Sequence, residues 1–425
     1  MAEVDVIAER AQPAIREQRT ADILIGIPTF NNEETIAPVL SAARTALLQF
    51  PERKGVIAQV DGGSSDSTMQ RAKDTLQGEA SFAQVSYPVY PVHLMEGSHH
   101  SVPGKDSAYR TIFFLAEELD AKACCIVGGD AIVTPDWIAS LVHPVLETGF
   151  DLAAPFYQRH KYSGFLVNGI LYPLLRALFG RRLRQPIGSD FGYSRSLVRQ
   201  CLSLDTWGGE AARRDIDLWV SVQAIQYELK LCQVYLGARP RSTKESGQDV
   251  SSILAHLAGA MYVVMEETAE LWHRVRSSTN IPVFGLRFDQ ENGGPPPDVK
   301  SMIGAFRLGC ENLQDLWGLI LPPATLLELR RLSRQSENQF RFPRELWARI
   351  IYDFAVAHRL RLIGRDHLLG ALAPLYMGWI ASFILAVMDG GADQAEAEVE
   401  QLCVAFESQK PYLISRWRWP DRFMP

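Results

Sequence analysis

The side chains in this chain that are best suited to bind a ligand follow directly after short apolar runs. The run ILIGI at 23–27 leads into the polar segment PTFNNEE at 28–34, and the run GVIAQV at 55–60 leads into DGGSSDST at 61–68. Asp61 at a strand end can accept hydrogen bonds from a base or a ribose hydroxyl, and the glycines after it let a flat ring approach the backbone. A single Asp-Gly-Gly-Ser segment is most often only a turn. Two polar loops at matching positions favour a nucleotide site.

Further charged residues stand at comparable places later in the chain. Lys105 precedes a helical pattern at 107–119, where its charge and the helix dipole suit a diphosphate. Asp130 follows the apolar run at 123–127, and a cation that bridges two phosphates needs such an anionic anchor. An Asp in a Gly-Gly-Asp segment can equally be part of an ordinary turn.

The elements that must position these residues alternate between strand and helix patterns. Short apolar runs followed by helical periodicity predict a parallel sheet, and ligands bind such sheets at the carboxyl ends of the strands. We expect further strands at 84–92, 151–157 and 231–236, and a helix after Thr134 and Pro135, which suit its N-cap and first position. Residues 159–186 are rich in arginine, which fits either a solvated helix end or a site for an acidic ligand.

The clearest boundary lies at 290–298, QENGGPPPD, which no helix or strand is expected to cross. Apolar residues with helical spacing continue beyond it. We therefore predict an N-terminal extension at 1–20, an α/β domain at 21–275, a linker at 276–298 and an all-helical domain at 299–425.

Composition narrows the class of protein. The chain has 425 residues and a net charge of −6, which gives no electrostatic case for nucleic acid. Its six cysteines form no C-x-x-C pair and indicate a reduced, cytoplasmic chain, and residues 1–20 lack the apolar core of a signal peptide. The uncharged stretch at 368–388 has the length of a membrane span. Because it contains Pro374 and two glycines in a chain of globular composition, we expect a buried helix, or a helix pair broken near Pro374, and no transmembrane helix.

Several of these segments resemble one known group of enzymes. IPTFNNEETI resembles the P-x-x-N-E-x-x-I opening of the GT-A glycosyltransferases, and VDGGSSDST resembles their V-D-D-G-S-x-D-x-T motif. PGK at 103–105 and GGD at 128–130 follow in the same order, and the likeness covers about residues 20–265. QPIGSD at 185–190 resembles the Q-P-L-x-G-E segment of the mannosylglycerate and glucosylglycerate (glucosyl-3-phosphoglycerate) synthases. The resemblance implies a GT-A, Rossmann-like α/β fold followed here by helices.

The same resemblance implies transfer of a hexosyl unit, with retention, from a UDP- or GDP-sugar to a small acidic acceptor such as glycerate or phosphoglycerate. We also expect a homodimer formed through the helical domain. The resemblance assigns the nucleotide sugar to Pro28, Thr29, Phe30, Asn31, Glu33, Asp61, Gly62, Lys105, Gly129, Asp130 and Arg241. It assigns the acceptor to Gly188, Ser189, Asp190 and Asp217. Asp190 and Asp217 are its catalytic candidates, and Asp130 is its ligand for Mg²⁺ or Mn²⁺. A capping role for Asp215 or Asp217 at the following helix is an equal alternative.

The chain departs from the family pattern at the metal site. Gly128 replaces the first Asp of the D-x-D motif, Arg241 stands near the position of the usual His, and Asp106 follows Lys105 where a Gly is usual. Either Asp130 and the phosphates hold the ion weakly, or Arg241 and Lys244 neutralise the diphosphate themselves. Two alternative functions stay open: a non-catalytic nucleotide-sugar-binding protein, and a transferase acting on a membrane-linked acceptor.

Overall fold

The computed structural model describes residues 3–89, 102–204, 207, 215–238, 250–285 and 296–420. The chain divides into two compact units. The first, called here the sheet unit, comprises Met1–Gln158, Gln185–Gln248 and Ile281–Phe288. The second, called the helical unit, comprises Arg159–Arg184, Asp249–Asn280 and Asp289–Pro425. The predicted α/β domain and the helical character of the C-terminal part are confirmed.

The sheet unit is built on an 8-stranded sheet with the order β3-β2-β1-β4-β6-β5-β7-β8. Its strands are β1 (Ile23–Thr29), β2 (Gly55–Asp61), β3 (Phe82–Ser86), β4 (Ala123–Val127), β5 (Leu152–Gln158), β6 (Asp190–Ser194), β7 (Leu231–Ala238) and β8 (Val283–Phe284). The seven residues of β1 and the five of β4 are all buried, as the unbroken apolar runs predict for central parallel strands.

One strand departs from the expected parallel sheet. β1 pairs in parallel with both β2 and β4, but β6 lies antiparallel between β4 and β5. The sheet is therefore mixed. Because β6 runs the other way, its first residue, Asp190, is paired with Val127 at the carboxyl end of β4.

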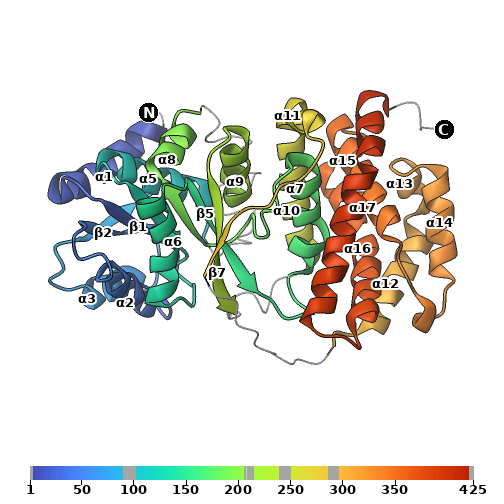
Figure 1. Ribbon diagram of the computed structural model, residues 1–425, viewed down its shortest axis with the longest axis horizontal. Coiled ribbons are helices and arrows are strands. Elements are labelled where there is room, and N and C mark those ends of the chain that lie inside the picture. Colours follow the sequence, from blue (N-terminus) through green and yellow to red (C-terminus); the bar gives the residue numbers. More distant parts are fainter. Residues whose placement is uncertain are drawn as a thin grey trace. The chain divides into compact units, whose positions relative to one another are not determined.

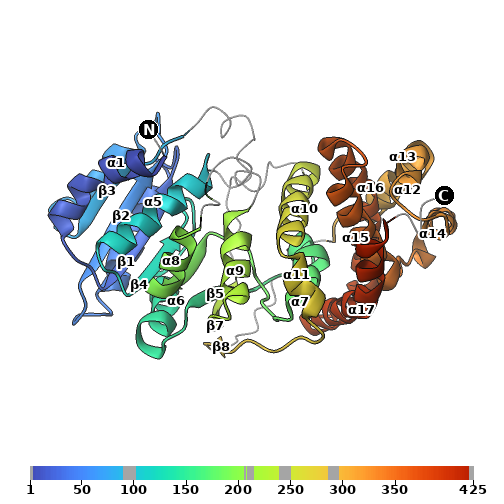
Figure 2. The same cartoon turned by 90° about the horizontal axis from the view of Figure 1, so that it is seen from above.

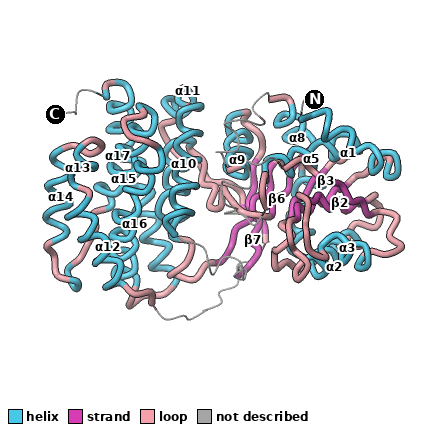
Figure 3. Tube along the Cα trace, turned by 180° about the vertical axis from the view of Figure 1, so that it is seen from behind, coloured by secondary structure: helices cyan, strands magenta, loops and turns pink. Residues whose placement is uncertain are grey.

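Helices cover both faces of this sheet. They are α1 (Glu3–Gln18), α2 (Ile36–Leu47), α3 (Thr68–Thr75), α5 (Lys105–Glu118), α6 (Pro135–Thr148), α8 (Arg195–Leu202) and α9 (Ile216–Gln226). Figures 1 and 3 show α1, α5 and α8 on one side of the strands and α2 and α3 on the other. Ile23, Ile25 and Ile27 share a core cluster with α2, α3 and α6, whereas a Cβ on the intervening Gly26 would meet Ile112 of α5 at 2.4 Å. Successive residues of β1 thus face opposite sides of the sheet and pack against the helices on both sides.

The strand order reverses between β1 and β4, because the chain proceeds outward from β1 to β2 and β3 and then returns to the other side. Such a reversal opens a crevice at the carboxyl ends of the two strands, where ligands bind in open α/β sheets. The polar loops after β1, β2 and β4 all leave the sheet at this edge.

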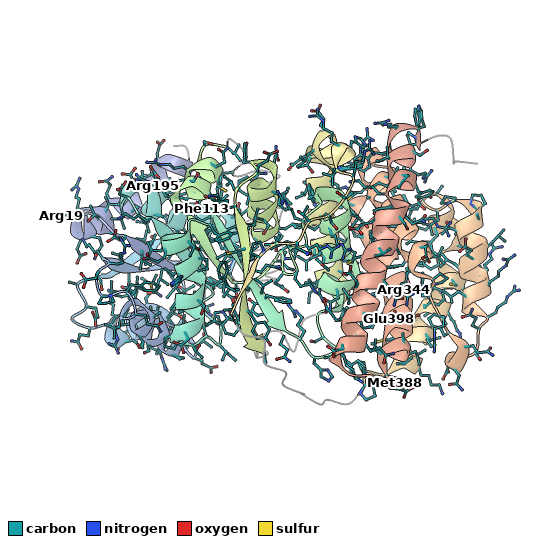
Figure 4. The ribbon with its side chains drawn as sticks, viewed as in Figure 1. Arg19, Phe113, Arg195, Arg344, Met388 and Glu398 are labelled. Carbon is teal, nitrogen blue, oxygen red and sulfur yellow. The ribbon has the colours of Figure 1, made fainter. Side chains whose placement is uncertain are left out.

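The helical unit contains a π-helix (Val167–Leu171), α7 (Tyr172–Phe179), α10 (Val250–Glu267), α11 (Ala269–Arg274), α12 (Val299–Asn312), α13 (Gln314–Gly318), α14 (Pro323–Ser333), a 3₁₀ turn (Glu337–Gln339), α15 (Arg344–Leu360), α16 (Arg365–Val387) and α17 (Ala392–Arg418). Helices α12, α13 and α14 lie together, and α15, α16 and α17 lie side by side (Figures 1 and 2). Figure 4 shows Arg344 of α15 next to Glu398 of α17, and their ion pair measures 2.5 Å.

Helix α16 contains the uncharged stretch that has the length of a membrane span. It is one helix that includes Pro374, so of the two expected alternatives the structure contains the single helix and not the pair broken near Pro374. By length and composition α16 could cross a membrane, with a mean hydropathy of 1.8, but 72 % of its apolar window is buried inside the structure. It packs against α10, α12, α15 and α17. This burial fits the alternative of a buried core helix.

The helical unit also takes in residues 159–184 and 249–280, which the sequence analysis grouped with the α/β domain. The reason is packing, because α7 contacts α17 and α10 contacts α16. The arginines near 180 belong to this arrangement. Arg184 is 2.8 Å from Glu396, and buried Arg176 is 2.6 Å from Glu400 and 2.9 Å from Glu407. These ion pairs favour a structural role over a site for an acidic ligand. The predicted boundaries at 275 and 298 stay a prediction.

Candidate functional site

The loops after β1 and β2 are joined by a set of reciprocal hydrogen bonds. The Ser65 N–H donates to Asn31 Oδ1 at 2.9 Å and the Ser67 N–H donates to Glu33 Oε2 at 3.1 Å. In return, the Glu33 N–H donates to Asp66 Oδ2 at 3.1 Å. Asn31 adopts a left-handed backbone with φ 52, which Asn tolerates better than most residues. The two loops therefore form one rigid surface rather than two separate turns.

Asp61 organises the second loop through both of its carboxylate oxygens. Oδ1 accepts from the hydroxyls of Thr29 at 2.8 Å and Ser64 at 2.6 Å. Oδ2 accepts from the backbone N–H groups of Gly63 at 2.9 Å and Ser64 at 2.8 Å. A carboxylate offers about four lone-pair sites, so these contacts use its acceptor capacity, and Asp61 is only 3 % exposed. In this state Asp61 shapes the loop, and contact with a base or ribose requires one of these bonds to be exchanged.

Two glycines on the site edge are required by close approach. A Cβ on Gly62 would lie 2.3 Å from the Tyr87 hydroxyl, which donates to Pro103 O at 2.7 Å. Burial and nearby carboxylates raise the pKa of Tyr87, so its hydroxyl remains a donor. A Cβ on Gly129 would lie 2.9 Å from Pro28 O. The absence of a side chain at both predicted glycines thus allows neighbouring segments to pack closely against the loops.

The antiparallel strand β6 brings the second group of predicted residues to the same edge. The Gly128 N–H donates to Ser189 O at 2.8 Å, which joins the end of β4 to the segment before β6. Asp190, 2 % exposed, accepts from Trp137 Nε1 at 2.8 Å and the Tyr157 hydroxyl at 2.6 Å on Oδ2, and from Ser189 Oγ at 2.9 Å on Oδ1. Through these hydrogen bonds Asp190 holds the segment before β6 in place.

Lys105 is the first residue of α5 and reaches the same segment. Its Nζ lies 2.5 Å from Asp217 Oδ2 and donates to Gly188 O at 3.1 Å. Asp217, 1 % exposed, also accepts from the Tyr109 hydroxyl at 2.6 Å and the Gly188 N–H at 3.2 Å. Burial, with Asp217 next, raises the pKa of Tyr109 well above its ordinary value, so this hydroxyl stays protonated.

The structure places the helix cap before α9 on a different residue from the catalytic candidate. Asp215 is the N-cap and accepts from the Leu218 N–H at 3.0 Å, while Asp217 lies in the first turn and faces Lys105. The capping alternative therefore holds for Asp215, whereas Asp217 makes an ion pair with Lys105. Thr134 caps α6 through the Trp137 N–H, as predicted.

A protein-held metal does not fit the described residues. They contain no group of three or more His, Cys, Asp or Glu side chains arranged for a metal ion. A Cβ on Gly128 would lie 3.0 Å from Ser189 Cβ and 3.3 Å from Asp130 Oδ1, so a second Asp at this position would be crowded. Half-buried Asp130 remains as one carboxylate at the end of β4. An ion at this edge would take most of its ligands from a diphosphate.

Sequence reasoning missed the aromatic residues of the site. Trp137, Tyr157 and Tyr109 are the donors that hold the two buried aspartates. For Tyr109 a signal existed, because it stands four residues after Lys105 and so shares its helix face. Arg241 and Lys244 lie outside the described residues.

Comparison with protein-family models and with curated proteins finds no match. Comparison with solved structures finds glucosyl-3-phosphoglycerate synthase from Mycobacterium tuberculosis. Its complex with Mn²⁺, uridine diphosphate and glucosyl-3-phosphoglycerate matches at 20% identity and TM-score 0.44, over 65% of this chain and 86% of that chain. The same synthase without a named ligand matches at 19% identity and TM-score 0.43, over 67% and 88%.

Proposed function

We propose that this protein is a hexosyltransferase that uses a nucleoside-diphosphate sugar and a small acidic acceptor. The observation that carries the proposal is the meeting of three predicted segments at the point where the strand order reverses. The clasped loops after β1 and β2, the Gly128–Asp130 segment after β4 and the Lys105 ammonium all belong to this edge. Rigid polar loops at such a crevice, with a cation at a helix N-terminus, suit a nucleoside diphosphate.

Each part of the site would contact a different part of the substrates. The loops at 28–33 and 61–64 would hold the nucleoside through backbone groups and the half-buried Phe30 and Asn31. Lys105 would contact the diphosphate, and Asp130 with the backbone of Gly129 would lie beside it. Gly188 and Ser189 would border the sugar and the acceptor. These roles use the predicted residues. Asp190 and Asp217, which are buried, would act indirectly, by holding Gly188 and Ser189 in place.

The proposed reaction needs little covalent chemistry from the protein. The acceptor hydroxyl oxygen forms a bond to the anomeric carbon while the bond from that carbon to the diphosphate oxygen breaks. The hydroxyl proton passes to the departing diphosphate, which takes the electron pair of the broken bond. Attack from the face that the diphosphate leaves retains the anomeric configuration, as the family resemblance implies. Catalysis then rests on positioning and on stabilising the leaving group.

The finer assignments belong to the same proposal. We propose a UDP- or GDP-sugar donor, glycerate or phosphoglycerate as acceptor, a divalent ion shared between Asp130 and the diphosphate, a homodimer and a cytoplasmic location. Arg241 and Lys244 stay alternative counter-charges for the diphosphate.

Thermal-shift binding tests this function directly, because a ligand that binds only the native state raises its stability with concentration. UDP-glucose, GDP-mannose, GDP-glucose and ADP-glucose are each added with and without Mn²⁺. We expect one donor to raise the melting temperature, with a larger shift in Mn²⁺ that is lost in Asp130→Asn. The exposed Asp74→Asn serves as the matched control. No shift with any donor would exclude the nucleotide-sugar proposal.

A non-catalytic binding protein is the second candidate, and it is favoured because the carboxylates of Asp61, Asp190 and Asp217 are buried and already accept several hydrogen bonds from the protein. The donor that binds is incubated with glycerate or 3-phosphoglycerate, and the product is followed by mass spectrometry. Formation of the glycosylated acid supports the transferase, whereas tight donor binding without any transfer supports the binding protein.

A further inference from the structure

We infer that Asp217 is a positioning residue that fixes the Lys105 ammonium and the Gly188 segment for a diphosphate, and not the group that deprotonates the acceptor. This inference rests on the proposed function, because it concerns the same site. Its basis is the geometry of one buried carboxylate that joins three separate places in the sheet unit.

Three partners of Asp217 come from the N-terminus of α5, from one turn further along α5 and from the segment before β6. They are the Lys105 ammonium at 2.5 Å, the Tyr109 hydroxyl at 2.6 Å and the Gly188 N–H at 3.2 Å. All three are donors, so each favours the ionised carboxylate. A general base must instead reach the proton it takes, at about 2.6–3.2 Å or through one water. At 1 % exposure Asp217 cannot do so without giving up one of these partners.

Lys105 keeps one donor available while it is bound to Asp217. An ammonium group has three N–H donors, and two of them are used by Asp217 Oδ2 and Gly188 O. No other atom of the described residues accepts from Nζ, and the Lys105 side chain is 13 % exposed. The third N–H is therefore the one that a phosphate oxygen can take, and the ion pair need not break when the ligand binds.

The flexible lysine side chain explains why such an anchor is needed. An unrestrained lysine side chain loses rotamer freedom when a ligand fixes it. Asp217 makes this ordering part of the folded protein, so that less is lost on binding. It also fixes the position of Gly188 relative to the ammonium, because Asp217 Oδ2 accepts from both Lys105 Nζ and the Gly188 N–H.

A positioning role for Asp217 and simple electrostatics predict opposite effects of Asp217→Asn on the binding of a diphosphate. Removing a negative charge close to a diphosphate should tighten binding by Coulomb's law. If Asp217 positions Lys105, Asp217→Asn instead weakens the binding of UDP, measured by calorimetry, by about tenfold, the usual size of a lost charge-assisted hydrogen bond. Asp215→Asn is the matched control, because it removes a charge two residues away and keeps the helix cap, for which Asn is as good as Asp.

A double-mutant cycle separates positioning from general destabilisation. In a Lys105→Met background, Asp217→Asn should weaken UDP binding much less than in the wild type, because the part of its effect that passes through the ammonium is already lost. If Asp217→Asn does not fold, Tyr109→Phe removes one donor to the same carboxylate without a change of charge, and a weaker loss of the same sign is expected. Transfer assays add the last readout: positioning raises KM for the donor more than it lowers kcat.

The outcomes distinguish this inference from the proposed function. A wild-type protein that binds no nucleoside diphosphate refutes the proposed function itself. Wild-type binding with unchanged or tighter binding by Asp217→Asn refutes only the positioning role. Unchanged UDP binding with a large fall in kcat would make Asp217 a catalytic base.

Discussion

Thr29 and Asp61 end neighbouring strands in exact register, and the Thr29 hydroxyl donates to the Asp61 carboxylate at 2.8 Å. This pair joins the loops that follow β1 and β2 before any ligand is present. The binding surface is therefore part of the folded core of the sheet unit, and changes to it should affect stability as well as binding.

Asp61→Ala is expected to destabilise the protein. The substitution leaves two hydroxyls and two backbone N–H groups without their acceptor, and of these the Thr29 hydroxyl is buried. An unsatisfied buried group costs about 1–3 kcal/mol, and water can reach the donors of Gly63 and Ser64, so we expect a total loss of about 2–3 kcal/mol. Denaturant unfolding measures it, with the exposed Asp74→Ala as control. A loss equal to that of the control would contradict the role given to Asp61.

Gly62→Ala and Gly63→Ala should differ in the origin and size of their effects. Gly63 has φ +84 and open space around it, so a methyl group there adds only backbone strain, about 1 kcal/mol. At Gly62 the new methyl group meets the Tyr87 hydroxyl oxygen at 2.3 Å and should cost more. The double variant Gly62→Ala/Tyr87→Phe should recover part of this loss, because the closest atom is gone. Thermal unfolding of the wild type, the two single glycine variants and the double variant tests this. Equal effects at the two glycines would contradict it.

Arg176→Ala should destabilise the helical unit far more than a surface Arg→Ala. Arg176 is 2 % exposed and pairs with Glu400 and Glu407, which are 48 % and 28 % exposed. Its loss removes a buried side chain together with two ion pairs, at a cost of about 3 kcal/mol. Arg199 is 54 % exposed beside Glu117, and Arg199→Ala should cost at most about 1 kcal/mol. Urea unfolding compares the two. Similar losses would mean that the ion pairs of Arg176 do not hold α7 to α17.

Lys410 should make the free energy of unfolding depend on pH in the alkaline range. Its Nζ donates to three carbonyls, Ala177 O at 2.8 Å, Val275 O at 2.9 Å and Leu178 O at 3.3 Å, and burial lowers its pKa to about 8. Between pH 8 and the ordinary value of 10.5 the unfolded chain therefore binds more protons than the folded protein. Over this range stability should rise with pH, by at most about 1.4 kcal/mol per unit.

The Lys410→Met variant isolates this effect, because every other titrating group is common to both proteins. The difference in unfolding free energy between wild type and variant, measured from pH 7 to 10, should shift in favour of the wild type as pH rises. A difference that stays constant with pH would show that the ammonium pKa is the same in the folded and unfolded states.

The local parts of the fold could be predicted from the sequence because they depend on neighbouring residues. The strands that end at Thr29 and Asp61, the start of a helix next to Lys105 and the Thr134 cap follow from apolar runs and capping residues. The direction of β6 could not be predicted, since DFGYS has the same composition whether it runs up or down the sheet. The partners of Asp190 and Asp217 come from distant parts of the chain, and no local pattern reveals that both carboxylates are occupied.

The antiparallel strand β6 also has a consequence for synthesis on the ribosome. β4 and β5 emerge before it, yet they are not neighbours, because β6 must enter the space between them. Residues 159–184, which belong to the helical unit, are made in between, and their partner α17 is made last. The growing chain must therefore leave the centre of its sheet open while it builds a segment that has nothing yet to pack against. Long-range closure of this kind is slow, and a chain released early would expose both the unfilled sheet and the apolar side of α7.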